Sequence, residues 1–368
     1  MNRSLSNFVK TNAVFLIALV AAAITCFIIP PDSEYIGYFD FKTLTCLFCV
    51  LAVVCALKNV NFFYILAQEI VKKFKNARRA VIALVYITFI GSMFIANDMA
   101  LLTFLPLGYM ILTTTGKEKY MAVTFILQNI AANLGGMLTP FGNPQNLFLY
   151  TKFNIPTLEF VSIMLTPFVI AIVLITLCCL FIKPEPLEFS GVSYRIDRKR
   201  TSFYLLLFAL SIIIVFRVIP YWIGLVVIPL CLVFSDRKAL VMVDYGLLGT
   251  FAAFFVFAGN MARIPAVQEF FSNLLQKNTL IFSILSCQFI SNVPSAVLLS
   301  QFTENYRDLL LGVNIGGAGT LIASLASLIT FREYIKSNPT EGFYYVALFS
   351  AFNFGFVIVL GGIMLLIG

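Results

Sequence analysis

The sequence predicts an all-α membrane protein with about nine transmembrane helices and two re-entrant hairpins, arranged as two inverted-topology repeats. Hydrophobic residues make up 60% of the 368 residues and charged residues only 11%, whereas a soluble domain carries about 25% charged residues. The apolar residues fall in runs long enough to cross a bilayer, which takes about 20 residues. A polar motif also recurs in the two halves of the chain.

The apolar runs define the predicted spans. They lie at residues 12–30, 40–57, 120–150, 154–182, 202–218, 220–234, 244–262, 308–331 and 341–367. Residues 61–75 and 265–276 are apolar on one face only, which is typical of helices that lie in the membrane interface.

Two stretches do not fit simple spans. Residues 80–113 would form a helix of about 51 Å, too long for one crossing, and the sequence IAND interrupts them at residues 95–98. Basic clusters flank both ends, so we predict a hairpin whose two ends emerge on the cytoplasmic side. Residues 279–302 are interrupted by SNVP at 291–294, and we predict a second hairpin there. Its length also suits a single span, and charge alone does not distinguish the two.

This topology puts the N-terminus in the cytoplasm and the C-terminus outside the inner (plasma) membrane. Most of the 25 Lys and Arg residues then face the cytoplasm, as the positive-inside rule requires. The same rule explains the net charge of +8, so we expect membrane lipid, and no nucleic acid, as a partner.

An internal repeat organises the chain. The sequence NLGGMLT at residues 133–139 recurs as NIGGAGT at 314–320, and FIAN at 94–97 recurs as FISN at 289–292. We therefore predict a first repeat at residues 1–183, a cytoplasmic linker at 184–200 and an inverted second repeat at 201–368. Each repeat contains a hairpin (80–113 and 279–302) and an interrupted helix (120–150 and 308–331). The alternative role of the paired glycines is close helix packing.

The four interruptions predict the functional site. Backbone polar groups cannot be left bare in lipid, so an interrupted helix lines a cavity or binds a ligand. Carbonyl and amide oxygens suit Na⁺, whereas helix N-termini attract anions. The predicted substrate-binding residues are Asn97, Asp98, Thr139, Asn143, Asn146, Ser291, Asn292, Thr320 and Ser324. The predicted residues for a coupling cation (Na⁺ or H⁺) are Asn97, Asp98, Gly142, Asn143, Asn292 and Ala323.

Asp98 is the most informative single residue, because a carboxylate near the bilayer centre is costly and functional by default. It would hold a cation or a proton, or it would cap the second arm of the hairpin. No Lys or Arg lies in the four interruptions, so an anion would depend on helix dipoles, amides and a co-bound cation. No cofactor is expected beyond a possible coupling Na⁺.

Other function classes fit less well. The chain has no His, which excludes imidazole metal sites and Ser–His or Cys–His catalysis, and we expect no enzyme activity. A channel would also use polar interruptions, but an inverted duplication with hairpins favours alternating access.

These motifs together resemble the ion transporter superfamily, which includes the citrate and divalent-anion/sodium symporters and the arsenite-efflux permeases. The resemblance implies a dimeric inverted-repeat fold that works as an elevator, with substrate and cations at the hairpin tips and helix interruptions. Asn97 and Asn292 would be the tip asparagines, and Gly142, Asn143, Ala323 and Ser324 the paired interruptions. The divalent-anion symporters favour Ser-Asn-Thr tips, from which Ala96-Asn97-Asp98 departs.

We therefore expect a homodimeric secondary active permease for a small anion, either a carboxylate such as citrate or a dicarboxylate, or an inorganic oxyanion, coupled to Na⁺ or H⁺. The alternatives are arsenite or antimonite efflux and Na⁺/H⁺ antiport through Asp98.

Overall fold

The computed structural model describes residues 13–188 and 197–367, and across these residues the secondary structure is helical apart from one isolated β-bridge. Six described helices are long and apolar enough to cross a membrane: Phe41–Asn59, Ala77–Ile95, Glu118–Leu138, Thr157–Leu180, Tyr245–Ala262 and Gly342–Ile367. Shorter apolar helices accompany them. The all-α membrane class is confirmed, and the number of full spans stays a prediction.

The first part of the described chain forms four helices. They are α2 (Ala13–Ile28), α3 (Tyr35–Tyr38), α4 (Phe41–Asn59) and the short α5 (Phe62–Val71), which lies within the stretch expected in the interface. Asp40 caps α4 by accepting hydrogen bonds from the backbone N–H and the hydroxyl of Thr43, at 2.9 and 2.6 Å. This cap fixes the start of α4.

Both stretches predicted as hairpins fold into two helices with one residue between them. The first forms α6 (Ala77–Ile95) and α7 (Asn97–Thr114), and the second forms α16 (Thr279–Ile290) and α17 (Asn292–Leu299). The linking residues adopt nearly the same conformation, with φ 59° and ψ 149° at Ala96 and φ 74° and ψ 159° at Ser291. Residues other than glycine are strained there, and such strain clusters at functional sites.

The helices predicted to be interrupted are interrupted. The first consists of η1 (Glu118–Tyr120), α8 (Met121–Gly135), η2 (Gly136–Leu138), a non-helical segment at 139–143 and α9 (Pro144–Lys152). The second consists of α18 (Tyr306–Gly316), a non-helical segment at 317–324 and α19 (Leu325–Ser337). Pro144 begins α9, where proline is favoured because its missing N–H would have no helical partner.

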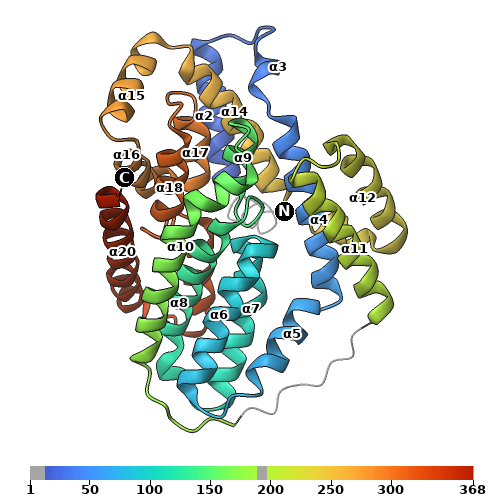
Figure 1. Ribbon diagram of the computed structural model, residues 1–368, viewed down its shortest axis with the longest axis vertical. Coiled ribbons are helices and arrows are strands. Elements are labelled where there is room, and N and C mark those ends of the chain that lie inside the picture. The colour runs from blue at the N-terminus through green and yellow to red at the C-terminus, as the bar shows by residue number, and fades with distance from the viewer. Residues whose placement is uncertain (1–12, 189–196, 368) are drawn as a thin grey trace.

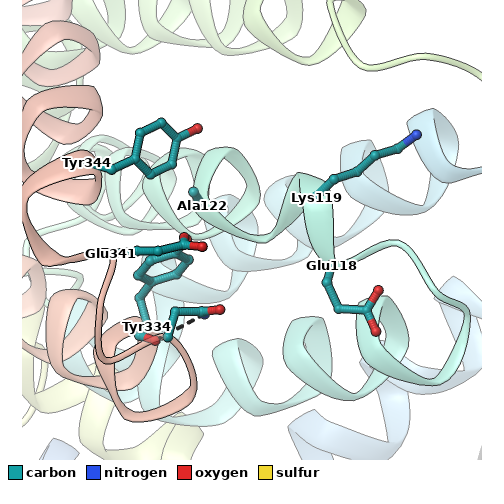
Figure 2. Close-up of a pocket in the computed structure, with 7 residues that line it drawn as sticks. Glu118, Lys119, Ala122, Tyr334, Glu341 and Tyr344 are labelled. Carbon is teal, nitrogen blue, oxygen red and sulfur yellow. Dashed lines mark hydrogen bonds between the residues drawn. The ribbon is translucent and has the colours of Figure 1, made fainter.

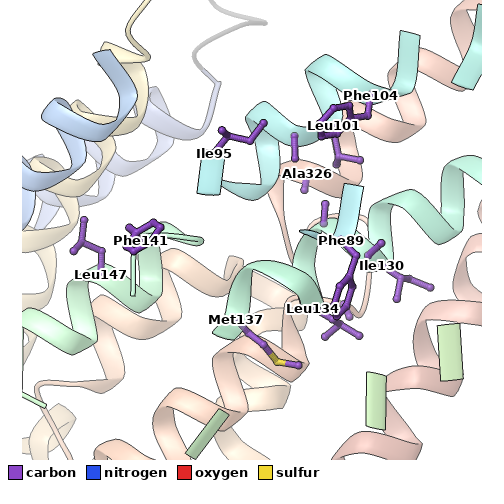
Figure 3. Close-up of a cluster of buried hydrophobic side chains, with 14 of the residues drawn as sticks. Phe89, Ile95, Leu101, Phe104, Ile130, Leu134, Met137, Phe141, Leu147 and Ala326 are labelled. Carbon is purple, nitrogen blue, oxygen red and sulfur yellow. The ribbon is translucent and has the colours of Figure 1, made fainter. Parts of the chain in front are cut away.

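The two halves of the chain pack crosswise. The helix α9 contacts α17 and α18, whereas α19 contacts α7 and α8. The second part of each interrupted helix therefore lies against the hairpin of the other half. Figure 3 shows part of the resulting core, in which Phe89, Phe104 and Ile130 of the first half lie near Ala326 of the second.

The remaining helices complete two groups. They are α10 (Thr157–Leu180), α11 (Arg198–Val215), α12 (Tyr221–Ser235), α13 (Arg237–Val241), α14 (Tyr245–Ala262), α15 (Pro265–Lys277) and α20 (Gly342–Ile367). Asp244 caps α14 by accepting from Leu247 N at 2.8 Å, as its position before that helix predicts.

The first group, which we call the α4 group, contains α2, α4 and α11–α14; the second, the hairpin group, contains α6–α10 and α16–α20. They meet mainly where α14 packs against α17 and α4 against α9. Figure 1 shows α4, α11 and α12 along one side and α20 at the opposite edge, with α5 near the lower end and α15 at the top.

The predicted linker at 184–200 is described only at its ends, since residues 189–196 lie outside the described part, as do residues 1–12. Its first residues form a strap across the base of the first hairpin: Ala77 N donates to Glu185 O at 2.8 Å, and Leu187 N donates to Lys75 O at 3.0 Å. The carboxylate of Glu185 accepts from Lys119, Lys117 and Tyr120 at 2.6, 2.9 and 2.8 Å. These donors lower the pKa of Glu185 to about 2.

Replacing Glu185 by Gln is expected to lower the thermal unfolding midpoint at pH 7, because the strap loses its charged acceptor. A carboxyl group whose pKa is lowered on folding stabilises the folded state above its unfolded pKa of 4.5 and loses that effect as the pH falls toward 2. The difference between wild type and E185Q should therefore be constant from pH 7 to 5 and shrink below that. A difference that grows on acidification would contradict this role.

Gly135 gives a second prediction. A Cβ atom at Gly135 would lie 2.2 Å from the carbonyl oxygen of Phe89, which is backbone and cannot swing aside. Gly135→Ala should therefore destabilise the protein by about 1–3 kcal/mol, the usual cost of overpacking. Gly362→Ala is the matched control, since nothing lies within 4 Å of that position. Equal unfolding midpoints for the two variants in detergent would contradict the close approach of α8 to α6.

Candidate functional site

Each hairpin tip carries an asparagine, and the two asparagines make the same hydrogen bond. The side-chain oxygen of Asn97 accepts from the backbone N–H of Asp98 at 3.0 Å, and that of Asn292 accepts from Val293 N–H at 2.9 Å. Each asparagine directly follows the strained residue of its tip and is buried. The repeated FIAN and FISN sequences thus encode one local structure.

Each tip is tied to the interrupted helix of its own half. The amide of Asn97 donates to Asn133 Oδ1 at 3.0 Å. In the second half, the backbone N–H of Asn292 donates to Ala323 O at 2.9 Å, and the hydroxyl of Ser291 donates to the same carbonyl at 3.2 Å. The tip therefore satisfies a backbone carbonyl that the interruption leaves free.

The two predicted threonines fasten the interruptions to the first arms of the hairpins. The hydroxyl of Thr139 donates to Met93 O at 2.7 Å, and that of Thr320 donates to Gln288 O at 3.2 Å. Thr320 N also donates to Gln288 Oε1 at 2.8 Å. Both threonines hold backbone in place, which is a structural role beside the substrate contact predicted for them.

A buried amide network joins the two halves. The Asn143 side chain donates to Asn133 O at 3.2 Å and to Asn314 Oδ1 at 3.3 Å, and Asn314 donates to Asn146 Oδ1 at 2.6 Å. Asn146 in turn donates to three carbonyls at the first interruption, those of Gly136 and Met137 in η2 and that of Thr139 just after it, at 3.2–3.4 Å. The network therefore replaces the helical hydrogen bonds that the interruption removes.

Several members of this network were not among the predicted site residues. They are Asn129, Asn133, Gln145, Gln288, Asn314, Ser327 and Thr330. The duplicated motif already contains Asn133 and Asn314, and their recurrence was the available signal. Asn129 lies inside an apolar run, and nothing in the sequence indicates that it donates to Ser327 Oγ, at 3.3 Å, in the other half.

The paired glycines allow close helix packing and also contribute to the site, the two roles considered from the sequence. A Cβ at Gly135 would meet Phe89 O, and one at Gly316 would lie 2.9 Å from Cys287 Cβ, so these two permit close packing against the hairpin arms. A Cβ at Gly136 would lie 2.4 Å from Asn143 Oδ1, and one at Gly317 would lie 2.7 Å from Asn292 Nδ2. The second glycine of each pair thus makes room for a site asparagine.

Asp98 lies in the first turn of α7 but does not cap it. The capping position is Ala96, and the side-chain oxygen that accepts a backbone N–H at the start of α7 is that of Asn97, so the capping role considered for Asp98 is wrong. Within the described residues, Asp98 Oδ1 and Asn143 Oδ1 are buried without a hydrogen-bond partner. Such oxygens have lone pairs free for a cation or a proton.

The electrostatics of the site favour an anion as well. Four helices, α7, α9, α17 and α19, begin at the tips and interruptions, and a helix N-terminus carries a partial positive charge. Ser324 caps α19 by accepting from Ala326 N at 3.2 Å. Asp98 is the only charged side chain in the four interruptions.

The structure brings the predicted residues together in two adjoining sets. Asn97, Thr139, Gly142, Asn143 and Asn146 surround the first interruption, and Ser291, Asn292, Thr320, Ala323 and Ser324 surround the second. The sets adjoin at α18, which carries Asn314 and leads into the second interruption.

A cavity of about 500 Å³ lies elsewhere, lined by residues of η1, α8, α19 and α20 that include Glu118, Tyr334 and Tyr344. The hydroxyl of Tyr334 is bonded to Glu341 there, and Figure 2 shows the two side chains close together. None of its lining residues belongs to the predicted site.

Comparison with known proteins agrees with this architecture. The chain is 36% identical over 299 residues to the uncharacterized transporter MJ0456 of Methanocaldococcus jannaschii, covering 80% of this chain and 81% of that protein. It is 28% identical over 331 residues to the inner membrane protein YbiR of Escherichia coli, covering 86% of each. The citrate transporter family (CitMHS) matches residues 6–305. The chain is therefore a multi-pass membrane transporter that belongs to the citrate transporter family.

Proposed function

We propose that this transporter is a secondary active permease for a small carboxylate anion such as citrate, coupled to Na⁺ or H⁺. The observation that carries the proposal is that four helices begin at the two tips and two interruptions, beside a buried amide network, and that no Lys or Arg lies in these segments. Such a site binds a carboxylate through N–H groups and helix dipoles. Family membership favours a carboxylate over arsenite, antimonite or another inorganic oxyanion.

The anion's charge requires a compensating cation, because Asp98 would otherwise repel it. The buried oxygens of Asp98 and Asn143, with the carbonyl of Gly142, would hold Na⁺, or Asp98 would carry the proton. In the second half, Ala323 O already accepts from Asn292 N and Ser291. Movement of that tip would free this carbonyl for a cation.

We also propose the inverted topology: repeats at residues 1–183 and 201–368, nine spans, hairpins that open to opposite sides, a cytoplasmic N-terminus and an external C-terminus, in the inner membrane. The crosswise packing of α9 and α19 supports it. The basic residues Lys75, Lys117 and Lys119 at the base of the first hairpin support a cytoplasmic position for that end.

Alternating access would follow if the hairpin group moves past the α4 group, as an elevator does. The contact between the groups includes tilted aromatic rings, with the ring of Phe148 of α9 at 5.6 Å from that of Phe255 of α14, and apolar surfaces slide at little cost. Arg217, after α11, donates to the carbonyls of Tyr150 and Ile155 and lies 4.0 Å over the Tyr150 ring. These contacts of Arg217 would have to break during the movement. We propose a homodimer, as in the superfamily, with the α4 group as the fixed part.

A second candidate is Na⁺/H⁺ antiport, favoured by the buried and unpartnered Oδ1 of Asp98. In that case Asp98 would exchange the two cations without an anion.

Asp98→Asn is expected to abolish gradient-driven accumulation, because the amide keeps the shape of the side chain but loses the charge that couples the cation. We would measure uptake of citrate, succinate, phosphate and arsenite into proteoliposomes under Na⁺ or pH gradients. Asp308→Asn, in the first turn of α18 and outside the network, is the matched control. If the protein exchanges Na⁺ for H⁺ and moves none of the anions, the permease proposal is wrong and the protein is an antiporter.

Asn146→Ala should reduce transport roughly 10- to 100-fold, because it leaves buried carbonyls unpaired at about 1–3 kcal/mol each. The control is Asn353→Ala, since Asn353 is equally buried but donates to Phe349 O of its own helix. If both variants transport equally well, the first interruption does not form the binding site.

A further inference from the structure

An apolar groove runs along α6, beside α5 and outside the site described above. It has a volume of about 440 Å³ and is lined by Ile70, Phe74, Arg79, Ile82, Ala83, Tyr86, Ile87 and Ile90. The hydroxyl of Tyr86 is already bonded to that of Thr176 at 2.5 Å. Arg79 is therefore the one charged residue among those that line the groove.

The length of the groove matches one leaflet of a bilayer. From Arg79 to Ile90 the helix rises about 16 Å at 1.5 Å per residue, and half of the hydrocarbon core is about 15 Å. Ile90, at the far end, is 53% exposed. The groove therefore has the dimensions of a lipid acyl chain that enters beside Arg79.

The charge at the mouth of the groove is unbalanced. Arg79, Lys73 and Lys75 are all exposed, and none of the ion pairs in residues 13–188 and 197–367 includes any of them. A basic cluster at the end of an interfacial helix attracts anionic headgroups. A guanidinium without an ion-pair partner at the mouth suits a lipid phosphate, and the apolar groove beside it suits the attached acyl chain.

We propose that this groove binds an anionic phospholipid, with one acyl chain along Ile82, Ile87 and Ile90 and the headgroup phosphate on Arg79. The lipid would lie in the groove that α5 and α6 line together, and these two helices are in contact. It would therefore cover the boundary between the interfacial helix and the hairpin that carries Asp98.

The single tryptophan of the chain provides the test. Trp222, on α12, is replaced by Phe, and Ile87→Trp is introduced as a reporter in the groove. The full-length protein is placed in vesicles of equal parts phosphatidylglycerol and phosphatidylcholine, with one of the two lipids dibrominated to quench tryptophan fluorescence. Ile90→Trp serves as a second reporter if the first variant does not fold.

Brominated phosphatidylglycerol should compete for the groove about fivefold better than brominated phosphatidylcholine, the preference expected from one cationic side chain at the surface. Arg79→Gln should remove this preference. The native Trp222, 59% exposed on α12, should show no such preference in the otherwise unaltered chain.

Four results would overturn the proposal. Equal quenching by both lipids at position 87, or a preference that survives Arg79→Gln, would mean that the headgroup does not bind Arg79. The same preference at Trp222 would mean general enrichment of anionic lipid around the protein. Quenching by neither lipid would mean that protein, such as a second copy of this chain, covers the groove.

Discussion

The requirement that buried backbone groups be hydrogen-bonded governs this structure. Four helices are broken within it, and each break exposes carbonyl and N–H groups that lipid cannot satisfy. Asparagine meets this requirement because its side chain both donates and accepts. Asn146 donates to the freed carbonyls of the first interruption, and the tip of the second hairpin donates to Ala323 O in the second.

The same constraint explains why the site is nearly free of charge. Neutral amides satisfy the backbone without the cost of burying Lys or Arg, and helix N-termini supply positive potential instead. The strained conformations of Ala96 and Ser291 place each tip asparagine at the start of its second arm. In the function that we propose, a cation bound beside such a site would raise its affinity for an anion, which is the property that coupled transport needs.

The sequence predicted the interruptions well, because Asn, Gly and Pro close together within an apolar run disfavour a continuous helix. It also predicted the residues of each interruption. No comparable pattern in the sequence predicted the short helices α3 and α13. The capping role of Asp98 was wrong, because Asn97 Oδ1 instead accepts the backbone N–H of Asp98. The contacts of Asn129 with Ser327 and of Asn143 with Asn314 depend on packing between distant segments, which local patterns do not encode.

The claim that one amide network joins the two halves is tested most directly by a double-mutant cycle. Asn143→Ala, Asn314→Ala and the double variant would be compared by their free energies of unfolding in a denaturing-detergent titration. Residues of one hydrogen-bond network couple by about 0.5–3 kcal/mol, and we expect a coupling energy in this range. Additivity within about 0.5 kcal/mol would mean that the two interruptions are satisfied independently, and it would contradict a shared site.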